Sequence, residues 1–274
     1  GPLAPPEFAP VASTGPIPIY PQDFVFPRTI SEPGTYVLQG DLRIDDGMSA
    51  LNTAFIIDAD NVTLDLNGYE ISGDGMGPAG GDRVLFPGNT TVRNTTIRNG
   101  RVRDINLLIT TGLGVTFEAP RIEDLMITGV NAITLNDFGV MDRCVIRDPG
   151  SDNVIFMRND AVVRDCVISG FAGDAISVLR RCVVENNVIY DGDPNNSTGI
   201  SASFAAATEG RNTIRHNLIN MVQTPIDLDF GATGSRAQNN IATMFRSFGD
   251  LTGYDAPVAP NSLTAGPFHN VFVP

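Results

Sequence analysis

The stretch AVVRDCVISGFAGDAISVLRRCVVENNVIYDG, residues 161–192, contains two copies of one sequence motif. VVRDCVI at 162–168 returns as VVENNVI at 183–189, 21 residues later, with DAISV at 174–178 between the two copies. Apolar and polar residues alternate in both copies, which is the period of a β-strand and not that of a helix. The stretch therefore predicts short strands that recur at a regular interval.

The phrase recurs along most of the chain. Aligned on the step from polar to aliphatic residues, it occupies 91–97, 121–127, 140–146, 162–168, 183–189, 213–219 and 236–242. A strand-built repeat of about 20 residues predicts a solenoid, in which each coil stacks on the coil before it. The fifth positions of the units should then form one internal column: Thr95, Leu125, Cys144, Cys166, Asn187, Asn217 and Asn240.

The side chains in this column predict its chemistry. The three asparagines fit an internal ladder, in which each amide bonds the backbone or the next asparagine and so offsets the cost of its burial. Cys144 and Cys166 are expected to be buried packing residues and not nucleophiles. A second strand in the later coils aligns a column of isoleucines: Ile133, Ile155, Ile176, Ile200 and Ile226.

Two segments near the N-terminus extend this pattern. ISEPGTYVLQGDLRI (30–44) and FIIDADNVTLDLNGYEISG (55–73), followed by the ladder units to about residue 245, resemble the right-handed parallel β-helix proteins of the pectate-lyase-like superfamily. The resemblance implies an all-β, single-stranded solenoid of roughly 8–10 coils. That fold hosts polysaccharide lyases, glycoside hydrolases, epimerases, tailspikes, adhesins and structural proteins, so the resemblance does not choose a function.

The two ends of the chain leave the repeat. Residues 1–29 form a predicted Pro-rich N-terminal arm, residues 30–248 the β-helix domain, and residues 249–274 a C-terminal arm or cap. The arms are expected either to cap their own rod or to dock on a neighbouring subunit, which would propagate into a fibre. The aromatic residues assigned to such assembly are Tyr20, Phe24, Phe26, Phe268 and Phe272.

Composition narrows the class of protein. All 18 basic residues are arginine, and 31 acidic residues give a net charge of −13, which argues against a nucleic-acid partner. The lack of lysine excludes Schiff-base chemistry. The three cysteines show no metal-type spacing, and no apolar run is long enough to span a membrane. We expect an extracellular or cell-surface protein whose signal peptide has been removed.

Any glycan groove is expected on the outward positions that alternate with the isoleucine column. Asp227 and Asp229 should lie about 7 Å apart there, a spacing that suits two carboxylates or one hard cation. Arg158, three coils earlier, is placed about 14 Å away and completes the catalytic candidates. The binding candidates on the same outward columns are Glu118, Asn136, Ser201 and Ser203. No cofactor is required and no metal site is predicted, although Ca²⁺ is compatible with the acidic surface.

Three functions remain open: a structural subunit, a carbohydrate-active enzyme and a glycan-binding adhesin. The favoured prediction is a secreted, self-assembling structural subunit of a filament or surface layer, forming a homo-oligomer or polymer through its arms. The alternatives are a polysaccharide lyase or glycoside hydrolase that uses the outer strand face, or an adhesin that binds glycans there without cleaving them. Lyases of the resembled superfamily use an acidic Ca²⁺ cluster beside an Arg or Lys, and its hydrolases pair aspartates.

Overall fold

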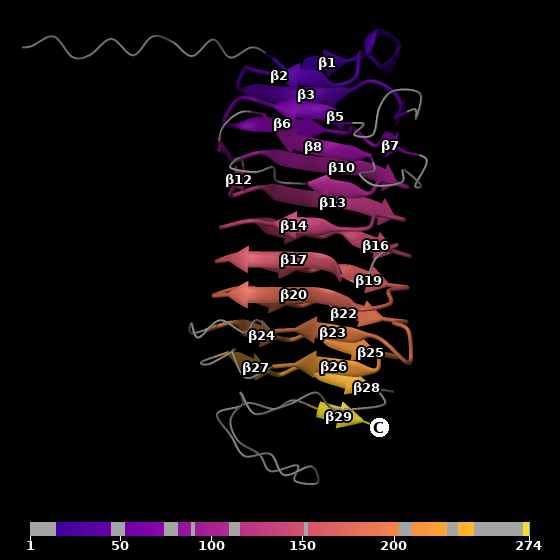
Figure 1. Ribbon diagram of the computed structural model, residues 1–274, viewed down its shortest axis with the longest axis vertical. Coiled ribbons are helices and arrows are strands. Elements are labelled where there is room, and N and C mark those ends of the chain that lie inside the picture. Colours follow the sequence, from indigo (N-terminus) through magenta and orange to yellow (C-terminus); the bar gives the residue numbers. More distant parts are fainter. Residues whose placement is uncertain are drawn as a thin grey trace, which may run out of the picture.

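A computed structural model describes residues 15–44, 53–73, 82–88, 91–109, 116–150, 153–202, 210–228 and 235–243, and the backbone of 271–273. These residues form a parallel β-helix: every strand pairing in them is parallel, and their one helical segment is a short 3-10 turn, η1 (Pro21–Asp23). The coils stack into a rod with the N-terminal and C-terminal rungs at opposite ends (Figure 1). The all-β solenoid predicted from the repeat is confirmed.

The strands line three faces of the rod. The first face contains β1 (Ile17–Ile19), β3 (Gly34–Leu38), β6 (Val62–Asp65), the first halves of β10 (Thr96–Arg103) and β13 (Arg121–Thr128), β15 (Val140–Asp142), β18 (Val162–Arg164), β21 (Val183–Glu185), β24 (Thr213–Arg215) and β27 (Arg236–Gln238). The second face contains β4 (Leu42–Arg43), β7 (Glu70–Ser72), the second halves of β10 and β13, β16 (Val145–Arg147), β19 (Val167–Ser169), β22 (Val188–Tyr190), β25 (Leu218–Asn220), β28 (Ile241–Thr243) and β29 (Val271–Val273).

The third face closes the coil. It contains β2 (Arg28–Ile30), β5 (Thr53–Ile57), β8 (Arg83–Pro87), β11 (Leu107–Ile109), β14 (Ile133–Leu135), β17 (Asn153–Asn159), β20 (Asp174–Arg180), β23 (Thr198–Ser201) and β26 (Thr224–Asp227). A bridge between Leu107 and Ala132 joins its N-terminal four strands to its C-terminal five. A short pair, β9 (Val92–Arg93) with β12 (Phe117–Glu118), lies beside it.

Identical side chains stack inside the rod because the rungs are in register. The predicted isoleucine column is confirmed: its five members pair rung by rung along the third face and are all buried. At about 4.8 Å per rung, the ten rungs of the first face span roughly 43 Å. The hydrophobic core is therefore one continuous column of aliphatic side chains enclosed by the three faces.

The asparagine ladder also forms as predicted. The Asn187 amide donates to Asn217 Oδ1 at 3.0 Å, and the Asn217 amide donates to Asn240 Oδ1 at 2.9 Å. Each carbonyl oxygen in turn accepts the backbone N–H of the rung before it, so Asn187 also receives the N–H of Cys166 at 3.0 Å. All three asparagines are buried, and these bonds satisfy their amides.

A second internal ladder was not foreseen in the sequence. Cys182 donates its backbone N–H to Asn212 Oδ1 at 2.9 Å, and Asn212 donates its own to Ser235 Oγ at 3.1 Å. All three side chains are buried at the corner that precedes the first face. Each of the three residues directly precedes a first-face strand, β21, β24 or β27, and this shared position is the sequence feature that could have revealed the ladder.

One register prediction was wrong. The structure pairs Ile97 with Ile122 and Gly100 with Leu125, so Thr95 does not belong to the column of Leu125. The chain reads TVRNT at 91–95 and TIRNG at 96–100, and both phrases fit the repeat equally well. Strand β10 decides between them, because its eight residues run across two faces and pair with both β6 and β7.

The corner between the second and third faces alternates aspartate with glycine. Asp104, Gly129, Asp148, Gly170 and Asp191 occupy successive rungs, and each has a positive φ. A Cβ on Gly129 would lie 2.7 Å from Asp104 Oδ1, and one on Gly170 would lie 2.4 Å from Asp148 Oδ1. The carboxylates of Asp104 and Asp148 thus lie over the next rung, where a Cβ would overlap them; after Asp191, Met221 occupies the equivalent corner position.

Candidate functional site

The outer surface of the third face, over β14, β17, β20, β23 and β26, is where the sequence places a glycan groove. Its outward column pairs in register as Thr134, Phe156, Ser177, Ser201 and Asp227. Phe156 and Asp227 are partly exposed, whereas Ser177 and Ser201 are only 5% and 4% exposed. The exposed positions alternate with the isoleucines, because strand side chains point to opposite sides.

A second outward column beside it was missed in the sequence. Asn153 pairs with Asp174, which pairs with Thr198, which pairs with Thr224. Asp174 Oδ2 accepts a hydrogen bond from Ser177 Oγ at 2.8 Å, so the two columns are connected. These residues lie two positions before the isoleucines, where strict alternation predicts an inward side chain, so the sequence pattern carries no signal for their exposure. Together the two columns make a flat polar surface with one aromatic ring on it.

The structure separates the catalytic candidates. Arg158 lies near the end of β17 and Asp227 at the end of β26, three rungs and two strand positions apart, or about 16 Å. The Arg158 side chain is exposed and forms no ion pair with another described residue. Asp229 and Ser203 lie outside the described residues, so the predicted aspartate pair keeps the status of a prediction.

Two binding candidates do not lie where the sequence placed them. Glu118 is on β12, outside the isoleucine-bearing sheet, and its Oε2 lies 2.8 Å from Arg93 Nε in an ion pair. Asn136 follows β14 but is only 2% exposed, and neither polar atom of its amide has a hydrogen-bond partner in the structure. The expectation of one shared outward column was wrong for Glu118, which directly precedes the left-handed corner residue Ala119, whereas Asn136 and Arg158 each lie two positions before theirs, Phe138 and Asp160.

The three cysteine thiols are buried inside the rod. Cys144 and Cys166 stack on one another, and the contact with Cys166 together with burial raises the pKa of the Cys144 thiol. Burial likewise raises the pKa of Cys182. Both shifts keep the thiols protonated and unreactive. Among the described residues, no group of three or more His, Cys, Asp or Glu side chains is arranged to hold a metal ion, and no helix is long and apolar enough to cross a membrane.

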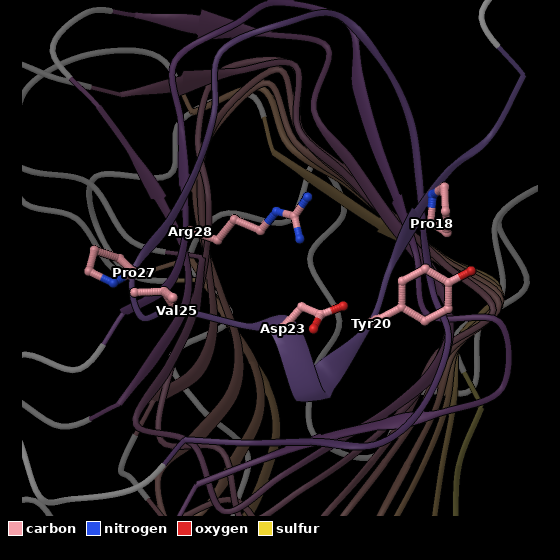
Figure 2. Close-up of a pocket in the computed structure, with 6 residues that line it drawn as sticks. All are labelled: Pro18, Tyr20, Asp23, Val25, Pro27 and Arg28. Atoms are coloured by element: carbon pink, nitrogen blue, oxygen red, sulfur yellow. The ribbon is translucent and has the colours of Figure 1, made fainter.

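The N-terminal end of the rod carries a hollow of about 510 Å³, lined by Pro18, Tyr20, Asp23, Val25, Pro27 and Arg28. Figure 2 shows these residues around the end of the rod, where η1 lies. Phe24 packs edge-on against Phe55 of β5, with 5.1 Å between the ring centroids, and its ring is tilted against that of Phe26 at 4.6 Å. Of the aromatics assigned to assembly, Tyr20, Phe24 and Phe26 therefore lie at this end on their own rod. Phe268 is outside the described residues, and Phe272 is described only as backbone in β29.

Comparisons with known proteins give distant similarities only. No protein-family model and no curated protein matches the chain. Two solved structures of Azotobacter vinelandii, the A-modules of the mannuronan C-5 epimerases AlgE6 and AlgE4, are each 12% identical, with TM-scores of 0.41 and 0.37. They cover 95% and 92% of this chain and 89% of their own.

A third similar structure is a double mutant of the tailspike of E. coli bacteriophage HK620. It is 10% identical, has a TM-score of 0.34, and aligns over 85% of this chain and 50% of its own. These values are too low to carry any argument about activity. The stacked parallel sheets themselves make this chain a parallel β-helix protein.

Proposed function

We propose that this protein binds a glycan along the third face without cleaving it. The observation that carries the proposal is the pair of adjacent polar columns, which place at least one exposed or partly exposed hydroxyl, amide or carboxylate group on each rung from β17 to β26. Such groups hydrogen-bond sugar hydroxyls, and the ring of Phe156 offers a surface for the apolar side of a sugar. The rungs repeat at about 4.8 Å, so a linear polymer lying along the rod meets the same chemistry at each step.

Binding is favoured over hydrolysis by the spacing of the described aspartates on this face, a comparison that does not include the predicted pair of Asp227 and Asp229, because Asp229 lies outside the described residues. Asp174 and Asp227 differ by two rungs and by three positions along the strand, which places them about 14 Å apart. Glycoside hydrolases set their two carboxylates about 5–9.5 Å apart, so this pair cannot act on one glycosidic bond. Arg158 is similarly distant from Asp227, which separates the proposed base of a lyase from its acidic partner.

Assembly end to end, the function favoured by the sequence, finds no support at the N-terminal rung. Ile19 O accepts the N–H of Gln39 at 2.9 Å, so Ile17 and Ile19 direct their backbone groups toward β3. Pro18 therefore faces the edge of the sheet that no other described strand covers, and it has no N–H to donate. Proline on an edge strand is a common barrier to further strand addition.

The test is a glycan array probed with the full chain and with Asp174→Asn/Asp227→Asn. We expect the double variant to lose most of its signal on the glycans that the wild type binds, because two charged acceptors of sugar hydroxyls are gone. Asp165→Asn is the matched control: it removes an exposed carboxylate at the corner between the first and second faces. Equal binding by all three proteins would refute the site, and shortened products after incubation with a bound glycan would refute the absence of cleavage.

A further inference from the structure

The second face carries an apolar stripe on its outer surface. The stripe is one outward column that pairs in register through six rungs: Met126, Val145, Val167, Val188, Leu218 and Ile241. Met126, Leu218 and Ile241 are 43%, 41% and 46% exposed, and the valines are half-buried. These six positions carry no charge; the column continues beyond Met126 with Arg101, and exposed Arg147 lies two residues after Val145 on the same face.

The first face, one corner away on the same coils, has the opposite character. One of its two outward columns is mostly charged, whereas the other includes the half-buried Val140, Val162 and Val183. The charged column reads Asp65, Arg98, Glu123, Asp142, Arg164, Glu185, Arg215 and Gln238. Neighbouring rungs form ion pairs, such as Arg215 with Glu185 at 2.6 Å and Arg98 with Asp65 at 3.2 Å. Over the rungs from β13 to β28, the outward positions of the second face among the described residues carry one charged side chain, Arg147, so this face is the less charged of the two and is better suited to burial.

We propose that a second copy of this chain covers the apolar stripe, so that two rods pack side by side through their second faces. A second copy is the occupant that the surface fits best because it presents the same stripe at the same rung spacing. The aliphatic side chains of the two copies can then interdigitate over all six rungs. Such a two-fold contact is isologous and closes at a dimer.

The charges beside the stripe are compatible with both two-fold arrangements. When the rods are antiparallel about an axis between β19 and β22, Asp165 of one copy faces Asn186 of the other, and Asp148 faces Met221. When the rods are parallel, Arg143 of one copy faces Asp148 of the other. Neither arrangement sets carboxylate against carboxylate, which a chain of net charge −13 must avoid in order to associate with itself.

The size of the stripe sets the expected affinity. Six rungs at about 4.8 Å, on a face about 17 Å wide with its corners, give about 500 Å² per copy. The total of about 1,000 Å² lies at the lower limit for a specific interface, so the dimer should be weak and should dissociate on dilution. This inference does not depend on glycan binding, because the second and third faces are separate surfaces.

The first experiment is sedimentation equilibrium of the full chain with a matched pair of variants. Val188→Arg places a charge in the stripe, and Val183→Arg places the same charge on the first face of the same coil, beside Glu185. Both valines point outward and are half-buried. We expect Val188→Arg to weaken the dimer about tenfold or more, because the charge would be buried without a partner, while Val183→Arg leaves the constant unchanged. A wild type that stays monomeric at millimolar concentration, or equal effects of the two variants, would overturn the proposal.

Cysteine cross-linking supplies an independent readout. Val167→Cys and Val188→Cys are oxidised separately and as a mixture, and the native cysteines do not compete because they are buried. Antiparallel packing predicts a disulfide between the two different variants, and parallel packing predicts one within each variant; either pattern supports the proposal. Failure of every combination to cross-link, while the wild type still dimerises, would place the interface elsewhere and overturn it.

Discussion

Replacing Gly170 by alanine tests how the second corner is built. Gly170 has φ +73°, and a Cβ there would lie 2.4 Å from Asp148 Oδ1 and 3.1 Å from the Asp148 backbone nitrogen. The variant therefore carries two costs. One is the left-handed backbone, which costs an alanine about 1 kcal/mol, and the other is the overlap with the carboxylate of the preceding rung.

Gly68 separates the two costs. It has φ +82°, but a Cβ there would meet nothing within 4 Å. Gly68→Ala should therefore lose only about 1 kcal/mol of unfolding free energy. Gly170→Ala should lose about 2–4 kcal/mol, since relieving the overlap displaces Asp148 or the rung itself at a cost of about 1–3 kcal/mol.

The assay is urea unfolding followed by circular dichroism, with each variant alone and with Asp148→Gly added to Gly170→Ala. Removing the carboxylate should recover most of the extra loss, because the remaining contacts with Asp148 are backbone atoms beyond 3 Å. A coupling between the two positions close to the size of the overlap is the expected result. If Gly170→Ala costs no more than Gly68→Ala, or if Asp148→Gly rescues nothing, the alternation of aspartate and glycine does not arise from this contact.

Three further outcomes follow from the interior and the corners. Asn217→Ala should cost about 3 kcal/mol in the same unfolding assay, because it leaves the buried N–H of Asn187 without an acceptor, whereas Gln238→Ala on the outer surface should cost little. Iodoacetamide should label none of the three cysteines in the native protein at pH 8 and all of them in denaturant. The pKa values of Cys144 and Cys182 are raised in the native state, so above about pH 8.5 these thiols ionise only in the unfolded chain. The free energy of unfolding should therefore fall as the pH rises above this value. Arg181 donates two hydrogen bonds to Asp160 and holds the pKa of that carboxyl below its ordinary value. Arg181→Ala should therefore lose a small amount of unfolding free energy at neutral pH, and this loss should vanish as acid titrates Asp160. A loss that is the same at pH 3 and pH 7 would exclude the ion pair as its source.

The repeat alone was enough to predict the coil. Residues that recur every 20 or so positions must stack if the chain forms strands, so the isoleucine column and the ladder of Asn187, Asn217 and Asn240 could be read directly from the sequence. Their positions in the structure agree because each side chain is identical or nearly identical to its neighbours above and below. The ladder of Cys182, Asn212 and Ser235 escaped notice because its members differ in type.

The sequence on its own determined the period, the strand type and the buried columns, because these depend on local alternation and on the spacing of like residues. The tertiary structure alone decided the register of β10, since TVRNT and TIRNG are interchangeable until the neighbouring rungs select one by hydrogen bonding. It also placed Glu118 on β12, outside the predicted groove, and buried Asn136, because the residues that cover a side chain come from other coils and are distant in the sequence. The distances between Arg158, Asp174 and Asp227 are likewise set by how many rungs lie between them, and the stacking of whole coils determines that number.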